Sequence, residues 1–166
     1  MVIYRIKQFL WTVTSSFKPI DKSIIYKYLN DEEVKLFFLL RVSEQHHSIR
    51  VCKDALMRSY DINYIDKKKL ARIALLHDIG KINSNLNVID KSILVILDKI
   101  TSGKLKRYED IKKIDYYYNH PKKSVDLLKH VKKYDDEFLE AIEKHHYNKI
   151  ESNIYLKIIK EADNNS

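Results

Sequence analysis

The chain has 166 residues, of which 45% are hydrophobic and 33% charged, a composition that excludes intrinsic disorder and suffices for one domain with its own core. Two glycines and two prolines are too few for the many tight turns of a sheet-rich domain, so an all-α fold is expected. The net charge of +8 permits an anionic partner, but the lysines are scattered and form no block typical of nucleic-acid binding.

Residues 1–30 predict a helical extension that packs on a domain formed by residues 31–166. The apolar residues of the first expected helix recur at three- and four-residue spacing and are Val2, Ile3, Ile6, Phe9, Leu10, Val13 and Phe17. Arg5 and Lys7 interrupt this stretch and no small-residue cleavage site follows, which argues against a signal peptide. A membrane-surface or partner-binding helix is the alternative interpretation. A short helix over 21–28 is expected next.

Two further helices follow. Asp31 is predicted to cap the first, because the acidic residues that follow it face the positive end of the helix dipole. Its apolar residues keep helical spacing and are Val34, Phe37, Phe38 and Val42. Ser43 is the predicted cap of the second helix. The buried stripe expected there comprises Ile49, Cys52, Ala55, Leu56 and Tyr60.

The middle of the chain predicts two more helices. The first has one buried face, formed by Leu70, Ile73, Ala74 and His77. Gly80 is expected to end this helix by freeing the backbone as the chain turns away. The apolar run over 93–97 is long enough to be a strand. Polar residues on both sides let it extend as a buried helix, which is the interpretation adopted.

The last part of the chain predicts three helices. Pro121 suits the first position of a helix, so one helix is expected to begin at His120-Pro121. Asp135 or Asp136 is expected to cap a helix over 137–146, and Ser152 to cap the last helix, over 153–163.

The expected architecture is therefore a single-domain all-α bundle of about eight helices. No stretch reaches the roughly 18 uninterrupted apolar residues that indicate a membrane span. The single cysteine, Cys52, excludes an internal disulfide and indicates a reducing, cytoplasmic compartment. The sequence does not predict an oligomeric state.

Histidines occur near the ends of several expected helices and are His46, His47, His77, His120, His130, His145 and His146. In a compact bundle such ends can converge on one pocket. Imidazole and carboxylate groups suit Zn, Fe or Mn, and each ligating histidine usually donates its other N–H to an acceptor. From spacing alone, a metal site and a set of helix-capping groups are equally supported.

The order of these residues resembles the HD superfamily of metal-dependent phosphohydrolases. Its His…His-Asp…Asp signature is matched by HHSIRV with His47, LLHDIGK with His77-Asp78, and IIKEADN with Asp163. The HDIG form of the central motif is complete. The agreement runs from about residue 43 to residue 163. The preceding DEEVKLFFLL segment is similar to small stand-alone bacterial HD proteins.

The resemblance implies a site for one or two divalent transition metals, namely Fe, Mn, Zn, Ni or Co, with Mg as a further candidate. The ligands implied for one ion are His47, His77, Asp78 and Asp163. Asp78 would bridge to a second ion held by His120 and by His145 or His146. Water activated by the metal would attack a phosphate. Asp78 and Lys81 are the residues expected to take part in catalysis.

Several neighbouring residues have two interpretations. Lys81 and Arg50 are candidates for contact with a substrate phosphate; alternatively, Lys81 interacts with a helix dipole and Arg50 forms a structural ion pair. His46 is interpreted as a supporting or surface residue and His130 as solvated. The segment HPKKS carries Lys122 and Lys123 instead of the Glu and Gly often found after this His-Pro. HHYN is not followed by Gly-Tyr-Pro, which argues against the cyclic-di-GMP phosphodiesterase branch.

The leading hypothesis is therefore a phosphohydrolase acting on a small phosphate ester or a nucleotide. The alternative is a catalytically weak HD-fold module that binds a nucleotide or regulates a partner, which the HPKKS segment and the amphipathic first helix favour. Nucleic-acid binding is disfavoured, because no recognised motif and no basic surface interleaved with aromatic residues is present.

Overall fold

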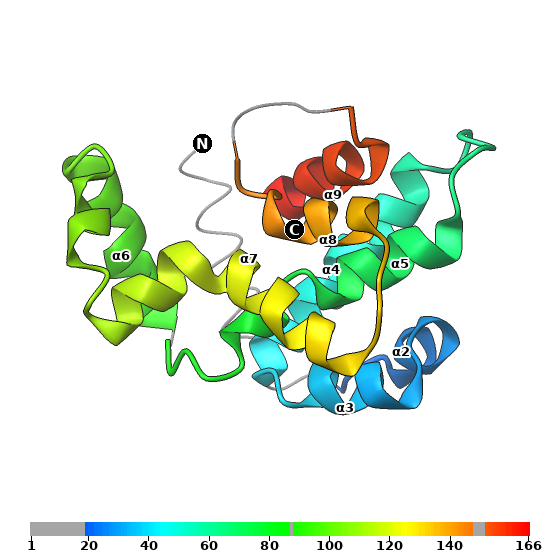
Figure 1. Ribbon diagram of the computed structural model, residues 1–166, viewed down its shortest axis with the longest axis horizontal. Coiled ribbons are helices and arrows are strands. Elements are labelled where there is room, and N and C mark those ends of the chain that lie inside the picture. The colour runs from blue at the N-terminus through cyan, green and yellow to red at the C-terminus, as the bar shows by residue number, and fades with distance from the viewer. Residues whose placement is uncertain (1–18, 87, 148–151) are drawn as a thin grey trace.

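A computed structural model of the chain describes residues 19–86, 88–147 and 152–166, so the helix predicted over 2–17 lies outside the described residues. Within these ranges the chain forms eight α-helices and no strand, which confirms the all-α prediction (Figure 1). The helices are α2 (Lys22–Tyr28), α3 (Asp31–Phe38), α4 (Val42–Arg58), α5 (Lys67–Leu76), α6 (Val88–Ile100), α7 (Lys112–Val131), α8 (Asp136–Glu143) and α9 (Ile154–Asn165). Two short 3-10 helices, η1 (Ile79–Lys81) and η2 (Lys104–Tyr108), flank α6. No helix in the described part is long and apolar enough to cross a membrane.

Helix α5 lies at the centre of the main core and contacts α2, α3, α4, α8 and α9. Its predicted inner face is confirmed, because Leu70, Ile73, Ala74 and His77 have no solvent exposure. Helix α2 also belongs to this core through the fully buried Ile25. The boundary between an N-terminal extension and the HD domain stays a prediction.

Three helix caps differ by one or two residues from those predicted. Asn30, not Asp31, caps α3, where its side chain accepts a hydrogen bond from Glu33 N at 2.9 Å and its N–H donates to the Glu33 carboxylate. Helix α4 begins before Ser43, with Arg41 at the cap position. Asn153, not Ser152, caps α9 by accepting from Leu156 N. Asn30 and Asp31, and Ser152 and Asn153, are adjacent residues that are all good caps, so sequence alone does not separate them; Arg41 makes no side-chain cap hydrogen bond, and nothing in the sequence marks it as a cap.

Helix α6 is confirmed as a helix, but it is not buried as predicted. Of its apolar residues after residue 89, Leu94 is buried in a small second core and Val95 is half-buried. The others are exposed, namely Ile93, Ile96, Leu97 and Ile100. The helix lies at one end of the molecule, where it packs on α7 and η2 (Figure 1). Protein therefore covers only one face of α6 among the described residues, whereas the predicted buried helix would be covered on all sides.

Helix α7 does not begin at His120-Pro121 as predicted. It begins eight residues before His120, at Lys112, and carries Pro121 in its interior. A proline in this place removes one backbone hydrogen bond and clashes with the preceding turn, at a cost of about 3 kcal/mol. The preference of proline for the first helical turn misled the prediction.

A buried ion pair fastens α3 to α5 on the side of the molecule away from α6. The Glu33 carboxylate is fully buried and accepts hydrogen bonds from the Arg72 guanidinium and, at 2.8 Å, from the Tyr134 hydroxyl. Burial raises the pKa of this carboxyl. The hydrogen bonds from Arg72, from the Asn30 backbone and from Tyr134 outweigh burial and leave the pKa below its ordinary value.

Candidate metal centre

The seven residues predicted as metal ligands come from separate parts of the chain and converge in space. They are His47 on α4, His77 and Asp78 at the C-terminal end of α5, His120 inside α7, His145 and His146 just after α8, and Asp163 on α9. Their donor atoms form two groups, and within each group all the atoms lie within 4.8 Å of one another. The first group is His47, His77 and Asp163; the second group is Asp78, His120, His145 and His146.

The first group is held around the Asp163 carboxylate. Its Oδ1 atom lies 2.9 Å from Nε2 of His47 and 3.7 Å from Nε2 of His77. The last helix therefore docks firmly enough to bring Asp163 to the site, although this residue is only three positions from the end of the given sequence. Contacts of α9 with α4, α5 and α8 account for this docking.

Asp78 lies between the two groups. Its Oδ2 atom is 3.4 Å from Nε2 of His77 and 3.6 Å from Nε2 of His47, in the first group. Its Oδ1 atom is 3.3 Å from Nε2 of His120 and 3.9 Å from Nε2 of His145, in the second group. One carboxylate therefore presents a different oxygen to each group.

His145 and His146, which the sequence left as alternatives, both lie in the second group. Nε2 of His146 is 3.0 Å from Nε2 of His120, and its Nδ1 is 3.6 Å from Asp163 Oδ2. Almost half of the His146 side chain is exposed, whereas His145 is buried. The cluster therefore opens to solvent on the side of His146.

The three buried histidines share one orienting contact. In each ring Nδ1 donates to a backbone carbonyl of the preceding turn: His77 to Ala74 at 2.8 Å, His145 to Ile142 at 2.6 Å, and His120 to Tyr116 and Tyr117 at 3.1 Å. A carbonyl oxygen can only accept, so in the neutral ring the proton is on Nδ1 and the lone pair is on Nε2. The Nε2 atoms of all three rings face the Asp78 carboxylate.

The ends of α5 and α8 explain two of these contacts. The last four carbonyls of a helix have no donor within the helix, and the carbonyls of Ala74 and Ile142 belong to these turns. Each is satisfied by the imidazole one turn later. A histidine at a helix end thus caps the helix and also presents an oriented Nε2 atom to the cluster, so the two interpretations left open by the sequence are compatible in one side chain.

The donor atoms fit a divalent transition metal. Three buried atoms of the cluster make no hydrogen bond of good geometry, namely His77 Nε2, Asp78 Oδ1 and His145 Nε2. Buried polar atoms are rarely left in this state unless a water or an ion satisfies them. Imidazole nitrogens with carboxylate oxygens are the ligand set that Fe, Mn, Zn, Ni and Co accept.

The electrostatics of the cluster favour a cation. Burial raises the pKa of the Asp78 and Asp163 carboxyls, but the surrounding histidines, and at Asp78 also Lys81, outweigh it and hold both pKa values well below the ordinary value. Burial alone would lower the pKa of His77, yet the same two carboxylates raise it to about 10. His120 and His145 have lowered pKa values, chiefly because of burial. The two carboxylates therefore hold a positive charge at His77, beside two neutral imidazoles.

Lys81 faces Asp78 and does not point along a helix axis into solvent. Its Nζ atom is 2.5 Å from Asp78 Oδ2 and 3.7 Å from Glu44 Oε2. Glu44 is buried and also pairs with Lys91 of α6. Burial raises the pKa of the Glu44 carboxyl, but Lys91 and Lys81 lower it to about 2. The sequence analysis missed Glu44 and Lys91, because only tertiary packing brings them beside the HDIG motif.

Gly80 is required for close packing, which differs from its predicted role in freeing the backbone. A Cβ atom at this position would lie 2.0 Å from the His120 carbonyl oxygen and 2.6 Å from Ser124 N. The Gly80 N–H donates to the Ser124 hydroxyl at 2.8 Å, and this hydroxyl donates to the His77 carbonyl at 2.8 Å. The fully buried Ser124 thus fastens the turn that carries Asp78 to the helix that carries His120.

The remaining predicted residues lie around the cluster. His46 is half-buried and supplies no donor atom to either group, and His130 is exposed at the end of α7, as expected. Arg50 is half-buried on α4, one turn after His47, and its contact with phosphate stays a prediction. Lys122 is exposed, and Lys123 pairs with Asp115 at 2.8 Å.

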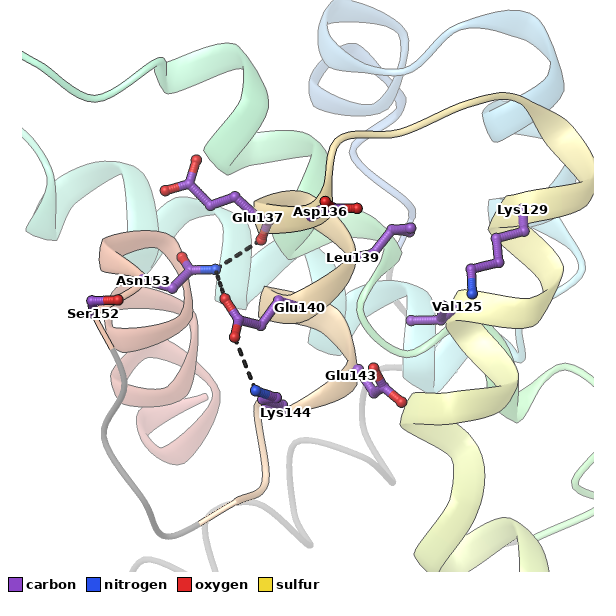
Figure 2. A pocket seen from close by; sticks show the side chains of 10 residues that line it. All are labelled: Val125, Lys129, Asp136, Glu137, Leu139, Glu140, Glu143, Lys144, Ser152 and Asn153. Carbon is purple, nitrogen blue, oxygen red and sulfur yellow. Dashed lines mark hydrogen bonds and ion pairs between the residues drawn. The ribbon is translucent and has the colours of Figure 1, made fainter.

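A surface pocket of about 590 Å³ between α7, α8 and α9 is separate from the cluster and contains none of its residues (Figure 2). Its polar groups bind one another. The Asn153 amide donates to Glu140 at 3.0 Å and to the Glu137 carbonyl at 2.8 Å, while Lys144 donates to Glu140 at 2.9 Å (Figure 2). These contacts fasten the start of α9 to α8 and so support the position of Asp163.

In a comparison with known protein families, the family model described as HD domain matches residues 45–166. This range contains every residue of both groups. No curated protein and no solved structure matches the chain.

Proposed function

The chain belongs to the HD domain family, and on this basis we propose that it is a metal-dependent phosphohydrolase that acts on a small phosphate ester or a nucleotide. The observation that carries the proposal is the position of Asp78, with one carboxylate oxygen toward each of two groups of imidazole and carboxylate donors. A carboxylate in this position is suited to bridge two divalent ions.

The residues proposed to hold the metal are the two groups described above. His47, His77, Asp163 and Oδ2 of Asp78 would hold one ion, and Oδ1 of Asp78 with His120, His145 and His146 would hold the other. When bound, divalent ions lower the pKa of a coordinated water toward neutrality and neutralise charge on a phosphate. The Nδ1 contacts of His120 and His145 keep Nε2 of these two neutral rings unprotonated for this purpose, whereas the positively charged His77 would release a proton when an ion binds.

Lys81 is proposed to bind a phosphate oxygen. Its pKa is raised: burial lowers it, but Asp78 and Glu44 outweigh burial, so the side chain is an ammonium at neutral pH. Its Nζ atom already contacts Asp78, and therefore lies at the border of the proposed metal site. The Glu44 carboxylate, which also pairs with Lys91, lies 3.7 Å from this ammonium as a second anionic partner. The half-exposed His146 marks the side from which a substrate would reach the site.

The test is hydrolysis by metal-loaded protein. Protein prepared without chelators is supplied in turn with Mn, Fe, Zn, Ni, Co and Mg, and is assayed on bis(para-nitrophenyl) phosphate, para-nitrophenyl phosphate and a panel of nucleotides. We expect turnover with at least one ion. Because the bound metal stabilises the transition state by several kcal/mol, Asp78→Ala should reduce the rate on the order of 10³-fold.

The matched control is Asp126→Ala, which removes an exposed carboxylate of α7 and should leave the rate unchanged. Tight nucleotide binding without turnover of any substrate would support the alternative, a regulatory HD module. Absence of bound metal from protein that was never exposed to a chelator would contradict the phosphohydrolase.

A further inference from the structure

We propose that Glu44 is a positioning residue for Lys81: its carboxylate keeps the Lys81 ammonium at the border of the metal cluster, where a substrate phosphate can reach it. The inference deepens the proposed phosphohydrolase function and rests on it. Its basis is the closeness of one ammonium to two buried carboxylates from different segments, Asp78 just after α5 and Glu44 on α4. Of these two carboxylates, only Asp78 belongs to the groups of donor atoms found among the described residues.

The Lys81 ammonium has donors left for a ligand. Its Nζ atom lies 2.5 Å from Asp78 Oδ2 and 3.7 Å from Glu44 Oε2. An ammonium carries three N–H donors, and the contact with Asp78 uses one of them. The distance to Glu44 exceeds hydrogen-bond length, so Glu44 attracts the ammonium by charge without taking a second donor. The Lys81 side chain is 15% exposed, so a ligand can reach it from solvent.

Asp78 is not sufficient to hold Lys81 when the proposed metal site is filled. The oxygen that contacts Lys81, Oδ2, is also the oxygen that faces His77 and His47 of the first group. A cation held there would draw on the charge of Asp78 and repel the ammonium. The charge of Glu44 would remain available to Lys81, because Glu44 supplies no donor to either group in the described part of the chain.

Glu44 is itself held in a fixed place. It lies on α4 three residues before His47, so one helix face brings both side chains to the cluster. Its Oε1 atom pairs with Lys91 of α6, and its Oε2 atom faces Lys81. A buried carboxylate requires such charged partners. The competing explanation is purely structural: the pair of Glu44 and Lys91 fastens α4 to α6, and the closeness of Lys81 is incidental.

The first test measures the affinity of Mn²⁺-loaded protein for inorganic phosphate by calorimetry, at equal metal content in every variant. A carboxylate repels an anion, so removal of the Glu44 charge would by itself strengthen phosphate binding. Loss of positioning acts in the opposite direction. We expect Glu44→Gln to weaken phosphate binding by up to the loss of about tenfold expected for Lys81→Gln. In the Lys81→Gln background, Glu44→Gln should cause no further weakening.

Two controls separate positioning from structural support. Lys91→Gln breaks the same contact between α4 and α6 but leaves Glu44 beside Lys81, and should weaken phosphate binding less than Glu44→Gln does. Glu32→Gln removes an equal charge from an exposed position of α3 and should have no effect. Stronger phosphate binding by Glu44→Gln would overturn the proposal. So would equal weakening by Glu44→Gln with and without Lys81, or equal weakening by Lys91→Gln.

The second test uses metal-free protein and no substrate. Asp78→Asn removes the charge of Asp78 and leaves Glu44 as the carboxylate within 4 Å of the Lys81 ammonium among the described residues. NMR measures how fast the hydrogens of this ammonium exchange with water, and the absence of the signal in Lys81→Gln identifies it. We expect slow exchange in Asp78→Asn and exchange about tenfold faster in Asp78→Asn/Glu44→Gln.

The two tests distinguish failure of this inference from failure of the proposed function. Equal exchange rates in Asp78→Asn and Asp78→Asn/Glu44→Gln would overturn the role of Glu44, whatever the protein hydrolyses. Faster exchange without Glu44, in a protein that hydrolyses no phosphate substrate with any ion, would contradict the proposed function and leave Glu44 as the residue that positions Lys81.

Discussion

Oδ1 of Asp78 lies 3.3 Å from Nε2 of His120, while Oδ2 of the same carboxylate lies 2.5 Å from the ammonium of Lys81. The contact with His120 joins α5 to α7, and it depends on the unusually close approach of these two segments at Gly80 and Ser124. The arrangement of the site can therefore be tested both through its ligands and through the packing that brings them together.

Gly80→Ala should destabilise the protein strongly, because the added Cβ would meet the backbone of α7 at 2.0 Å. Overpacking together with loss of the Ser124 hydrogen bonds predicts a fall of about 3 kcal/mol in the free energy of unfolding. The control is Gly103→Ala. An added Cβ at Gly103 would have no neighbour within 4 Å, so only the backbone strain of its φ of +81° opposes the substitution. This strain should lower the free energy of unfolding by about 1 kcal/mol. Urea unfolding of both variants measures the difference, and equal effects would contradict the packing role of Gly80.

Lys81→Gln should weaken substrate binding without weakening metal binding. Removal of the ammonium next to Asp78 takes away a competing cation, so metal affinity should stay the same or rise. If Lys81 binds a phosphate oxygen, KM should rise about tenfold, which corresponds to about 1.4 kcal/mol. Lys122→Gln, an exposed lysine on α7, should change neither quantity. Loss of metal without a change in KM would assign Lys81 to the metal site alone.

Glu33→Gln tests the core independently of the site. It leaves Arg72 without its buried carboxylate partner and should lower the free energy of unfolding by about 3 kcal/mol near neutral pH. The pKa of Glu33 is lowered in the folded protein, so the ion pair contributes fully above the ordinary value of 4.5 and its contribution is lost as pH falls through the lowered pKa. The difference between wild type and variant should therefore shrink in acid.

The control for Glu33 is Glu32→Gln, which removes an exposed partner of Lys35 and should change the free energy of unfolding by no more than about 0.5 kcal/mol. Chemical unfolding at neutral and acidic pH measures both variants. A Glu33→Gln effect that stays constant with pH would show that the charge of Glu33 is not what stabilises the contact between α3 and α5.

Helices with a regular apolar stripe could be predicted from the sequence, as the inner face of α5 shows. The start of α7 could not, because Pro121 is tolerated in the helix interior, beside a His120 ring whose Nδ1 contacts the carbonyls of Tyr116 and Tyr117. The prediction that α6 is buried was wrong, because the spacing of apolar residues does not reveal that a helix lies at the edge of the bundle. The local sequence pattern thus predicts which segments are helical. Contacts with neighbouring segments determine where a helix begins and how far it is buried.

The candidate site was likewise predicted only in part. The order of His47, His77-Asp78 and Asp163 in the sequence was sufficient to select residues that the structure brings together. Glu44 and Ser124 escaped notice, since their roles arise from contacts between helices distant in sequence. The histidine rings contact backbone carbonyls, and a sequence pattern does not show which carbonyl a side chain will contact.

The most direct test of the central claim, that Asp78 joins two metal groups, is the number of ions bound per chain. Protein equilibrated with Mn²⁺ or Zn²⁺ and dialysed is analysed for metal content in wild type, His47→Ala, His120→Ala and Asp78→Ala. We predict two ions in wild type, one in each histidine variant and no tightly bound ion in Asp78→Ala. An Asp78→Ala protein that is folded and still binds as many ions as wild type would contradict the account.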